Sequence, residues 1–126
     1  MKFQTLMIIK AVVCLVLGVP ILLAPEFLYF LFGASLNPSG AFVARQYGAS
    51  LIGNLMLTWI ARNAIESEAR SAITLGLCVY DAIGLVITLV AQFTGVLGPL
   101  GWFAALIYLF FAVGFGYFLM PQKKVA

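Results

Sequence analysis

The sequence contains no histidine and few charged residues of either sign. Its 126 residues include seven Lys and Arg, four Asp and Glu, and no His. The lack of histidine excludes bis-histidine haem ligation, histidine-based metal sites and a histidine general base. It also excludes a Ser-His-Asp triad, and the sequence has no Walker, GxGxxG, HExxH or GxSxG motif. We therefore expect a protein that is not an enzyme, with no catalytic residues, no metal site and no cofactor.

Cysteine is also scarce. Cys14 and Cys78 are the two cysteines of the chain, and both lie inside apolar runs without a CxxC or metal-ligand spacing. A disulfide between them is one interpretation. Buried free thiols are the other, and this is the one we expect.

Apolar residues dominate what is present. Hydrophobic residues make up 64% of the chain and charged residues 9%, whereas a soluble domain is about 25% charged. This composition indicates that lipid is the solvent. The net charge of +3 comes from basic residues scattered over chain and helix ends, which predicts no nucleic-acid partner.

Four apolar stretches reach the length of about 20 residues that a transmembrane helix needs. We therefore predict an all-α integral membrane bundle of four transmembrane helices, forming a single domain over residues 1–126. The first stretch is too long for the apolar region of a signal peptide, so we expect it to be retained. The predicted spans cover residues 3–24, 40–61, 71–93 and 99–120.

Residues typical of helix ends separate the spans. Asn37 followed by Pro38 predicts an N-cap and a first helical position, and Pro99 predicts a similar start for the last helix. Pro121 is expected to end that helix. The aromatic segment 25–33 predicts either a short helix in the membrane interface or a continuation of the first span.

The connection between the second and third spans carries charges of both signs. Arg62, Glu66 and Arg70 follow one another at intervals of four residues, the spacing of side-chain pairs on a helix. This spacing predicts a partly helical hairpin.

The basic residues predict the orientation in the membrane. In a four-span model five of them fall on one side, while the opposite loops, 25–39 and 94–98, contain none. The positive-inside rule then places both termini in the cytoplasm of a bacterial inner membrane. The five residues are Lys2, Arg62, Arg70, Lys123 and Lys124.

Asp81 is an acid predicted to lie near the middle of the bilayer. It stands eleven residues beyond Arg70, which corresponds to about 16 Å along a helix. An ionised carboxylate at this depth costs about 2.5–3.5 kcal/mol on insertion scales, so it must face other helices or water. A polar stripe with helical spacing surrounds it and predicts the inward face of the third span: Thr74, Cys78, Asp81, Gly84, Thr88 and Gln92.

Two other polar residues are predicted at a similar depth. Asn54 belongs to a stripe on the second span that also contains Tyr47, Ser50 and Thr58, and Lys10 lies on the first span about 10 Å inside. We expect Lys10, Asn54 and Asp81 to form one intramembrane polar cluster. The cluster has two interpretations: a proton or cation site in a transport path, or an interaction that sets helix register.

Arg45 lies nine residues before Asn54 and points away from that stripe. It is expected either to extend to the outer interface or to form an interfacial charge pair with Glu26.

Small residues at four-residue spacing predict close helix packing. The second span contains two such pairs, and the fourth span carries a longer stripe. With more than one such face, a protomer can use one internally and another for a neighbour, so we expect a homo-oligomer or a subunit of a membrane complex. The residues are Ala44 with Gly48, Ala49 with Gly53, and Gly101, Ala105, Tyr108, Ala112 and Gly116.

The first half of the chain resembles small bacterial inner-membrane proteins of the DoxX-like kind, which are four-helix proteins. The resemblance is carried by Pro25, Gly33 and the pattern Ala44-Arg45-x-x-Gly48-Ala49-x-x-x-Gly53. It implies the fold rather than an activity, and it makes Arg45 a position of interest.

These observations predict a non-catalytic multi-pass protein that acts as an oligomeric scaffold or as an accessory subunit, with membrane lipids as its surroundings. The alternative is a small oligomeric transporter or channel that uses the polar cluster around Asp81. A membrane enzyme or quinone-binding subunit finds no support, because no redox or nucleophilic set is present.

Overall fold

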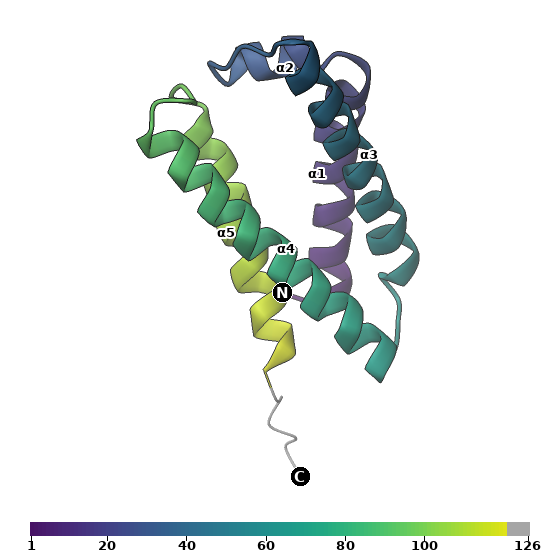
Figure 1. Ribbon diagram of the computed structural model, residues 1–126. Coiled ribbons are helices and arrows are strands. Elements are labelled where there is room, and N and C mark those ends of the chain that lie inside the picture. Colours follow the sequence, from purple (N-terminus) through teal and green to yellow (C-terminus); the bar gives the residue numbers. More distant parts are fainter. Residues whose placement is uncertain (121–126) are drawn as a thin grey trace.

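A computed structural model describes residues 1–120, and within this range every regular element is a helix (Figure 1). The prediction of an all-α protein is therefore confirmed. Pro121, Lys123 and Lys124, to which the sequence assigned a helix end and an orientation, lie outside the described residues. The helices are α1 (Phe3–Leu23), α2 (Pro25–Leu31), α3 (Pro38–Ala61), α4 (Glu68–Phe93) and α5 (Gly101–Leu119).

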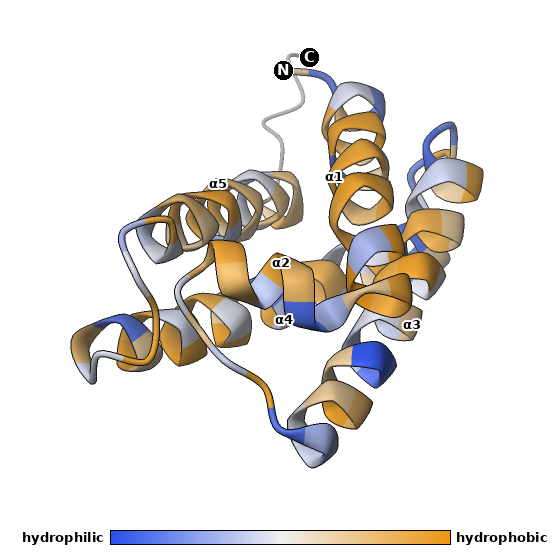
Figure 2. Cartoon of the chain, turned by 90° about the horizontal axis from the view of Figure 1, so that it is seen from above, coloured by the Kyte–Doolittle hydropathy of each residue, from blue (hydrophilic) through white to orange (hydrophobic). Residues whose placement is uncertain are grey.

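Three of the helices, α1, α4 and α5, are long and apolar enough to cross a membrane. The fourth expected span forms the 24-residue helix α3, which is long enough but is not among the three. The reason lies in its composition, because α3 includes Arg45, Gln46 and Asn54. Figure 2 shows hydrophilic positions along α3, whereas α1 and α5 are coloured mostly as hydrophobic.

The helix starts follow local chemistry. The Asn37 side chain accepts a hydrogen bond of 2.6 Å from the Gly40 amide, with Pro38 at the first helical position, so this predicted cap is confirmed. Ser67 caps α4 by accepting a bond from the Arg70 amide. The last helix begins at Gly101, just after the Pro99 turn, rather than at Pro99 itself.

The four long helices form two antiparallel pairs, α1 with α3 and α4 with α5 (Figure 1). In the first pair the backbones approach closely at Gly48, where an added Cβ would lie 2.8 Å from the Leu22 amide nitrogen. The packing role predicted for Ala44 and Gly48 is confirmed, since both are buried. Gly53, by contrast, has open space around it.

The two pairs meet at the end of the molecule that holds the N-terminus. A buried apolar cluster joins α1, α4 and α5 there, and above it the pairs diverge (Figure 1). Cys78 packs against this cluster, and both cysteines have free thiols, as expected. The buried members of the cluster are Phe3, Leu6, Met7, Leu77, Phe111 and Phe115.

The opposite end is closed by a contact between two loops. The Gly98 amide donates a hydrogen bond of 2.8 Å to the Phe32 carbonyl. The neighbouring Gly33 has a φ of 79°, and a Cβ there would lie 2.7 Å from the Gly98 nitrogen. Only glycine combines this backbone conformation with so close an approach. Segment 25–33 thus forms a separate short helix, α2, followed by a tight turn.

The connection is partly helical, because residues 68–70 belong to α4, but among the described residues the predicted pairing of Arg62, Glu66 and Arg70 is not formed. Residues 62–67 are not helical, so four-residue spacing does not bring these side chains to one face. Instead, the Arg62 guanidinium lies 3.9 Å from the centre of the Trp59 ring. The Arg70 guanidinium lies 3.9 Å from the centre of the Phe3 ring, and this contact joins the start of α4 to the start of α1.

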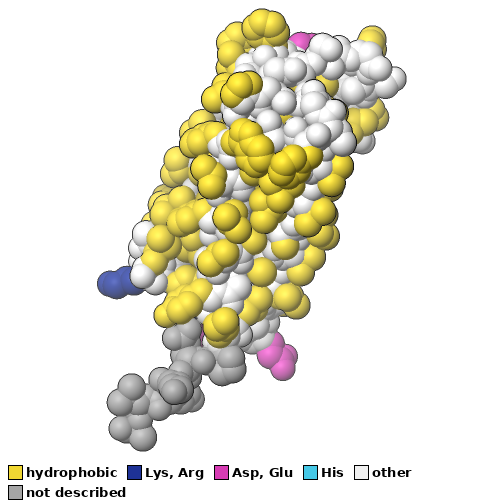
Figure 3. Space-filling model, turned by 90° about the vertical axis from the view of Figure 1, so that its left-hand side faces the viewer, with side chains coloured by type: hydrophobic (Ala, Val, Ile, Leu, Met, Phe, Trp, Pro, Cys, Tyr) yellow, Lys and Arg dark blue, Asp and Glu magenta, His cyan; other side chains and the backbone are white. Residues whose placement is uncertain are grey.

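The outer surface suits a lipid environment. Figure 3 shows a face covered by apolar side chains along its length, with the charged side chains at its two ends. Large hydrophobic residues are exposed on every long helix, for example Val16, Ile60, Ile87 and Phe103. A soluble monomer rarely exposes so much contiguous apolar surface.

The close approach at Gly48 yields a stability prediction. Gly48→Ala should push α1 and α3 apart and lower the free energy of unfolding by about 1–3 kcal/mol, the usual cost of overpacking. Gly76→Ala is the matched control, since a Cβ at Gly76 meets no atom within 4 Å, and it should be neutral or slightly stabilising. Unfolding in detergent micelles measures both, and equal stability of the two variants would contradict the tight α1–α3 contact.

Candidate functional site

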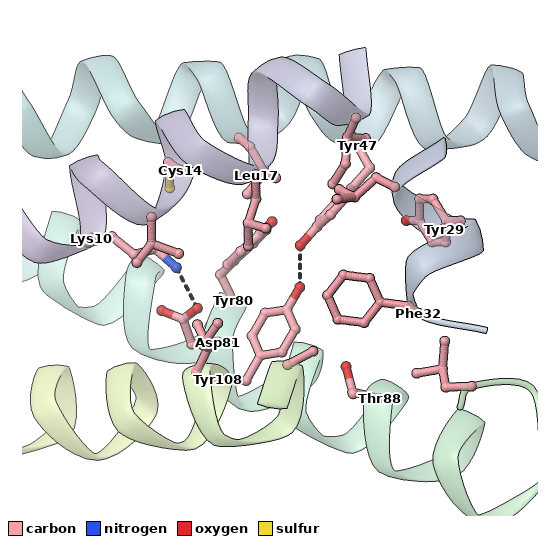
Figure 4. A pocket seen from close by; sticks show the side chains of 17 residues that line it. Lys10, Cys14, Leu17, Tyr29, Phe32, Tyr47, Tyr80, Asp81, Thr88 and Tyr108 are labelled. Carbon is pink, nitrogen blue, oxygen red and sulfur yellow. Dashed lines mark hydrogen bonds and ion pairs between the residues drawn. The ribbon is translucent and has the colours of Figure 1, made fainter. Parts of the chain in front are cut away.

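A cavity of about 140 Å³ lies between the two helix pairs, in the space where they diverge (Figure 4). Its walls come from all four long helices, and α2 with its following turn covers the outer end through Leu28, Tyr29 and Phe32. Most of the lining is apolar or aromatic. The polar side chains in the walls are Lys10, Cys14, Tyr29, Tyr47, Tyr80, Asp81, Thr88 and Tyr108.

Lys10 and Asp81 form an ion pair at the inner end of the cavity, which is the end nearer the N-terminus. The Lys10 Nζ donates a hydrogen bond of 2.6 Å to Asp81 Oδ1 (Figure 4). Lys10 is 3% exposed and Asp81 is fully buried. Because Lys10 comes from α1 and Asp81 from α4, the contact joins the two helix pairs. The structure thus brings together two of the three residues of the expected cluster.

Aromatic rings surround the rest of the Lys10 ammonium. Its Nζ lies 4.6 Å from the centre of the Phe111 ring and 5.2 Å from that of Tyr80. Both distances are within the range in which a cation is attracted to an aromatic face. The lysine therefore has partners on several sides, and it does not extend to an interface.

Asn54, the third expected member, makes no side-chain hydrogen bond with Lys10 or Asp81. Its Nδ2 is buried without a partner among residues 1–120. The polar stripe expected on α3 is only partly inward, because Ser50 is exposed while Tyr47 and Asn54 are half-buried. The buried face of α3 shares only Thr58 with that stripe, and its other members are Ala41, Ala44, Gly48 and Leu51.

The expected charge pair of Glu26 and Arg45 is not formed. Within the described part of the chain, Lys10 and Asp81 make the only ion pair. Glu26 lies on α2 and Arg45 on the outside of α3, and both are exposed. Closeness to the same end of the molecule does not make the two side chains face each other.

A second polar bridge crosses the cavity nearer its outer end. The hydroxyl groups of Tyr47 on α3 and Tyr108 on α5 are hydrogen-bonded (Figure 4). Gly84 makes room for this arrangement, because a Cβ at that position would overlap the Tyr108 ring. The two residues belonged to separate polar and small-residue stripes in the sequence, and no spacing signal linked them.

The inward face predicted for α4 is confirmed. Thr74, Asp81 and Thr88 are buried, and the remaining members of that stripe are half-buried. The residues between them, such as Val79 and Ile83, are exposed. Some residues of the inward face of α4 therefore pack against other helices, and others line the cavity.

Several polar atoms in the cavity walls lack a hydrogen-bond partner within residues 1–120. They include Asp81 Oδ2 and the Tyr80 hydroxyl, both of which are buried. Thr58, Thr74 and Thr94 donate to carbonyls of their own helices, whereas Thr88 makes no such bond and directs its hydroxyl into the cavity (Figure 4). The walls thus offer unused hydrogen-bonding capacity in a mainly apolar space.

The ion pair limits the chemistry of the site. The charge of Asp81 is balanced by Lys10, so a free cation could bind the carboxylate only by breaking the pair. A charge left alone in a dry interior costs several kcal/mol. The geometry therefore favours a fixed link between the helix pairs.

The pair makes a prediction for stability. Asp81→Leu should strand the Lys10 ammonium in the interior and lower the free energy of unfolding by about 3–5 kcal/mol. Asp81→Asn should cost less, because an amide oxygen can still accept the hydrogen bond. The double variant Lys10→Met, Asp81→Leu should recover most of the loss, since neither charge remains. Unfolding in micelles measures this double-mutant cycle; additive losses would show that the two side chains do not interact.

Comparison of the chain with known proteins finds no relative. No family model matches the chain, and neither a curated protein nor a solved structure matches it. The resemblance to proteins of the DoxX-like kind stays a prediction. Any function assigned to the chain therefore rests on the physical properties of its own residues.

Proposed function

We propose that the protein is a non-catalytic, multi-pass membrane protein that acts as an oligomeric scaffold or as an accessory subunit of a membrane complex. One observation carries this proposal: the outward face of α3. Arg45, Gln46, Ala49 and Gly53 lie on it and are all exposed. We call these four residues the α3 strip.

The α3 strip is costly if lipid covers it. At 1.5 Å per residue, the 24 residues of α3 extend about 36 Å, enough to cross a hydrocarbon core of about 30 Å. We propose that α3 crosses the membrane alongside α1, as the fourth span. Polar side chains in membrane helices almost always face other helices or water, so a neighbouring helix is the environment that suits Arg45 and Gln46.

Small residues within the α3 strip also favour a neighbouring helix as its partner. Ala49 and Gly53 are four residues apart, and an added Cβ at Gly53 meets nothing within 4 Å. A second helix can therefore approach the α3 backbone closely at this point, as at other small-xxx-small contacts in membranes. The resemblance to DoxX-like inner-membrane proteins includes Arg45, Ala49 and Gly53 and is consistent with a bacterial inner-membrane location.

The orientation proposed for the bundle places both termini in the cytoplasm. Lys2, Arg62 and Arg70 lie at one end of the molecule, where Gln4 of α1 donates a hydrogen bond of 2.6 Å to Asn63 of the loop. These three basic residues therefore mark the end of the molecule that the positive-inside rule places in the cytoplasm. Arg45 is the basic residue nearer the other end.

The strip is tested by a pair of glycine variants. Gly53→Leu should block the approach of a second helix and reduce the oligomer, or the copurifying partner, at least several-fold. Gly76→Leu, on the exposed side of α4 with equally open space, should leave the assembly unchanged. Native mass spectrometry from lipid nanodiscs measures the stoichiometry. A wild-type protein that is strictly monomeric and copurifies with nothing would refute the proposal.

The topology is tested separately. Reporter fusions after Ser39 and after Val96 should behave as periplasmic, and a fusion after Ile65 as cytoplasmic, because the basic residues lie at the Ile65 end. A cytoplasmic signal after Ser39 would show that α3 does not cross the membrane as proposed.

A second candidate function, a small transporter or channel, is favoured by the cavity itself. It lies between two helix pairs that are joined at one end by the Lys10–Asp81 pair and at the other by the Phe32–Gly98 contact. Separation of the pairs at either end would open it to one side. A pH-dependent flux into proteoliposomes, lost in Asp81→Asn, distinguishes this function from the first.

A further inference from the structure

We propose that the cavity between the helix pairs is a binding site for a small, uncharged, flat molecule that carries one hydrogen-bond donor, of the phenol class. This inference is independent of the α3 strip, because the cavity lies on the inner side of the bundle. Four properties of its walls define the ligand: size, shape, charge and hydrogen bonding.

The volume sets the size of the ligand. The cavity measures about 140 Å³, and an engineered apolar cavity of about 150 Å³ in another protein binds benzene. A single six-membered ring with a small substituent therefore fills the space. A drug-sized molecule is too large, since sites for such ligands are about 300–1,000 Å³.

Aromatic side chains set the shape. Tyr29, Phe32, Tyr47, Tyr80 and Tyr108 all contribute to the walls, and they surround the space from different helices (Figure 4). Aromatic rings attract other rings in offset or edge-to-face arrangements. These walls favour a flat ring over a branched aliphatic molecule of equal volume.

The ion pair sets the charge. Lys10 and Asp81 are the charged residues of the walls, and they neutralise each other at 2.6 Å. A charged ligand would leave water or a lipid headgroup without gaining a counter-ion, which is unfavourable in an apolar space. The ligand is therefore neutral, and a neutral apolar ring can reach the site through the bilayer.

The polar wall atoms that lack a hydrogen-bond partner determine which hydrogen-bonding group the ligand carries. Asp81 is fully buried, and its Oδ2 has no partner among the described residues. An ionised carboxylate can only accept hydrogen bonds, so the missing partner is a donor. The Tyr80 hydroxyl and the Thr88 hydroxyl offer further contacts from the same helix. A phenol hydroxyl supplies such a donor.

Three probes of similar size separate these properties: phenol, toluene and benzoate. Each is titrated into the purified full-length protein in detergent, with binding measured by calorimetry and by the shift of the unfolding temperature. We expect phenol to bind about tenfold more tightly than toluene, the effect of one hydrogen bond worth about 1.4 kcal/mol. Benzoate should not bind. Equal affinity for phenol and toluene, or tighter binding of benzoate, would overturn the proposal.

Cavity-filling variants locate the binding. Leu17 lines the cavity, whereas the adjacent Val16 is 60% exposed on the outside of the same helix. Leu17→Trp should abolish phenol binding, and Val16→Trp should leave it unchanged and controls for partition into the micelle. If Leu17→Trp fails to fold, the same comparison is made on α5. There Ile107→Phe fills the cavity and Leu106→Phe, on the exposed side, is its control. Phenol binding that survives both inward substitutions, or no binding by the wild-type protein, would show that the cavity holds water only.

Discussion

A buried charge in a membrane must meet its opposite, and the Lys10–Asp81 pair is how this protein meets that requirement. Lys10 comes from α1 and Asp81 from α4, so neither helix pair can balance its charge alone. Leaving either group unpaired in a dry interior would cost several kcal/mol. This contact and the apolar cluster of α1, α4 and α5 together fix the relative position of the two pairs at this end of the molecule.

The cavity is a geometric consequence of the same contact. Below the ion pair, large side chains such as Phe111 and Phe115 fill the space between the pairs. Above it the helices diverge (Figure 1), and the gap is crossed by the hydroxyl groups of Tyr47 and Tyr108. These two polar bridges, with α2 over the outer end, border the cavity.

Much of this arrangement was predictable, because it depends on properties that repeat along one helix. The inward face of α4 follows from helical spacing of its polar residues. The depths of Lys10 and Asp81 follow from the rise per residue, which made their contact a reasonable expectation. The Asn37 cap and the Pro38 start depend on adjacent residues and appear in the structure as expected.

What was not predictable depends on how one helix is rotated against another. The buried face of α3 follows its small residues, Ala44 and Gly48, rather than its polar ones, because close backbone contact with α1 decides the rotation. Asn54 is half-buried, and its Nδ2 has no hydrogen-bond partner among the described residues. The Tyr47–Tyr108 bridge depends on two helices from different pairs, and no pattern within either helix contains that information.

The two pairs are also continuous segments of the chain. Residues 3–61 contain α1 to α3, and residues 68–119 contain α4 and α5. During synthesis the first pair can insert and pack before the second leaves the ribosome, with Lys10 held near one wall of an unfinished interior. The arrival of Asp81 then neutralises that charge, and α5 follows it in the chain and completes the apolar cluster with Phe111 and Phe115. The loop over residues 62–67 becomes the natural place at which the gene could be divided into two separately inserted halves.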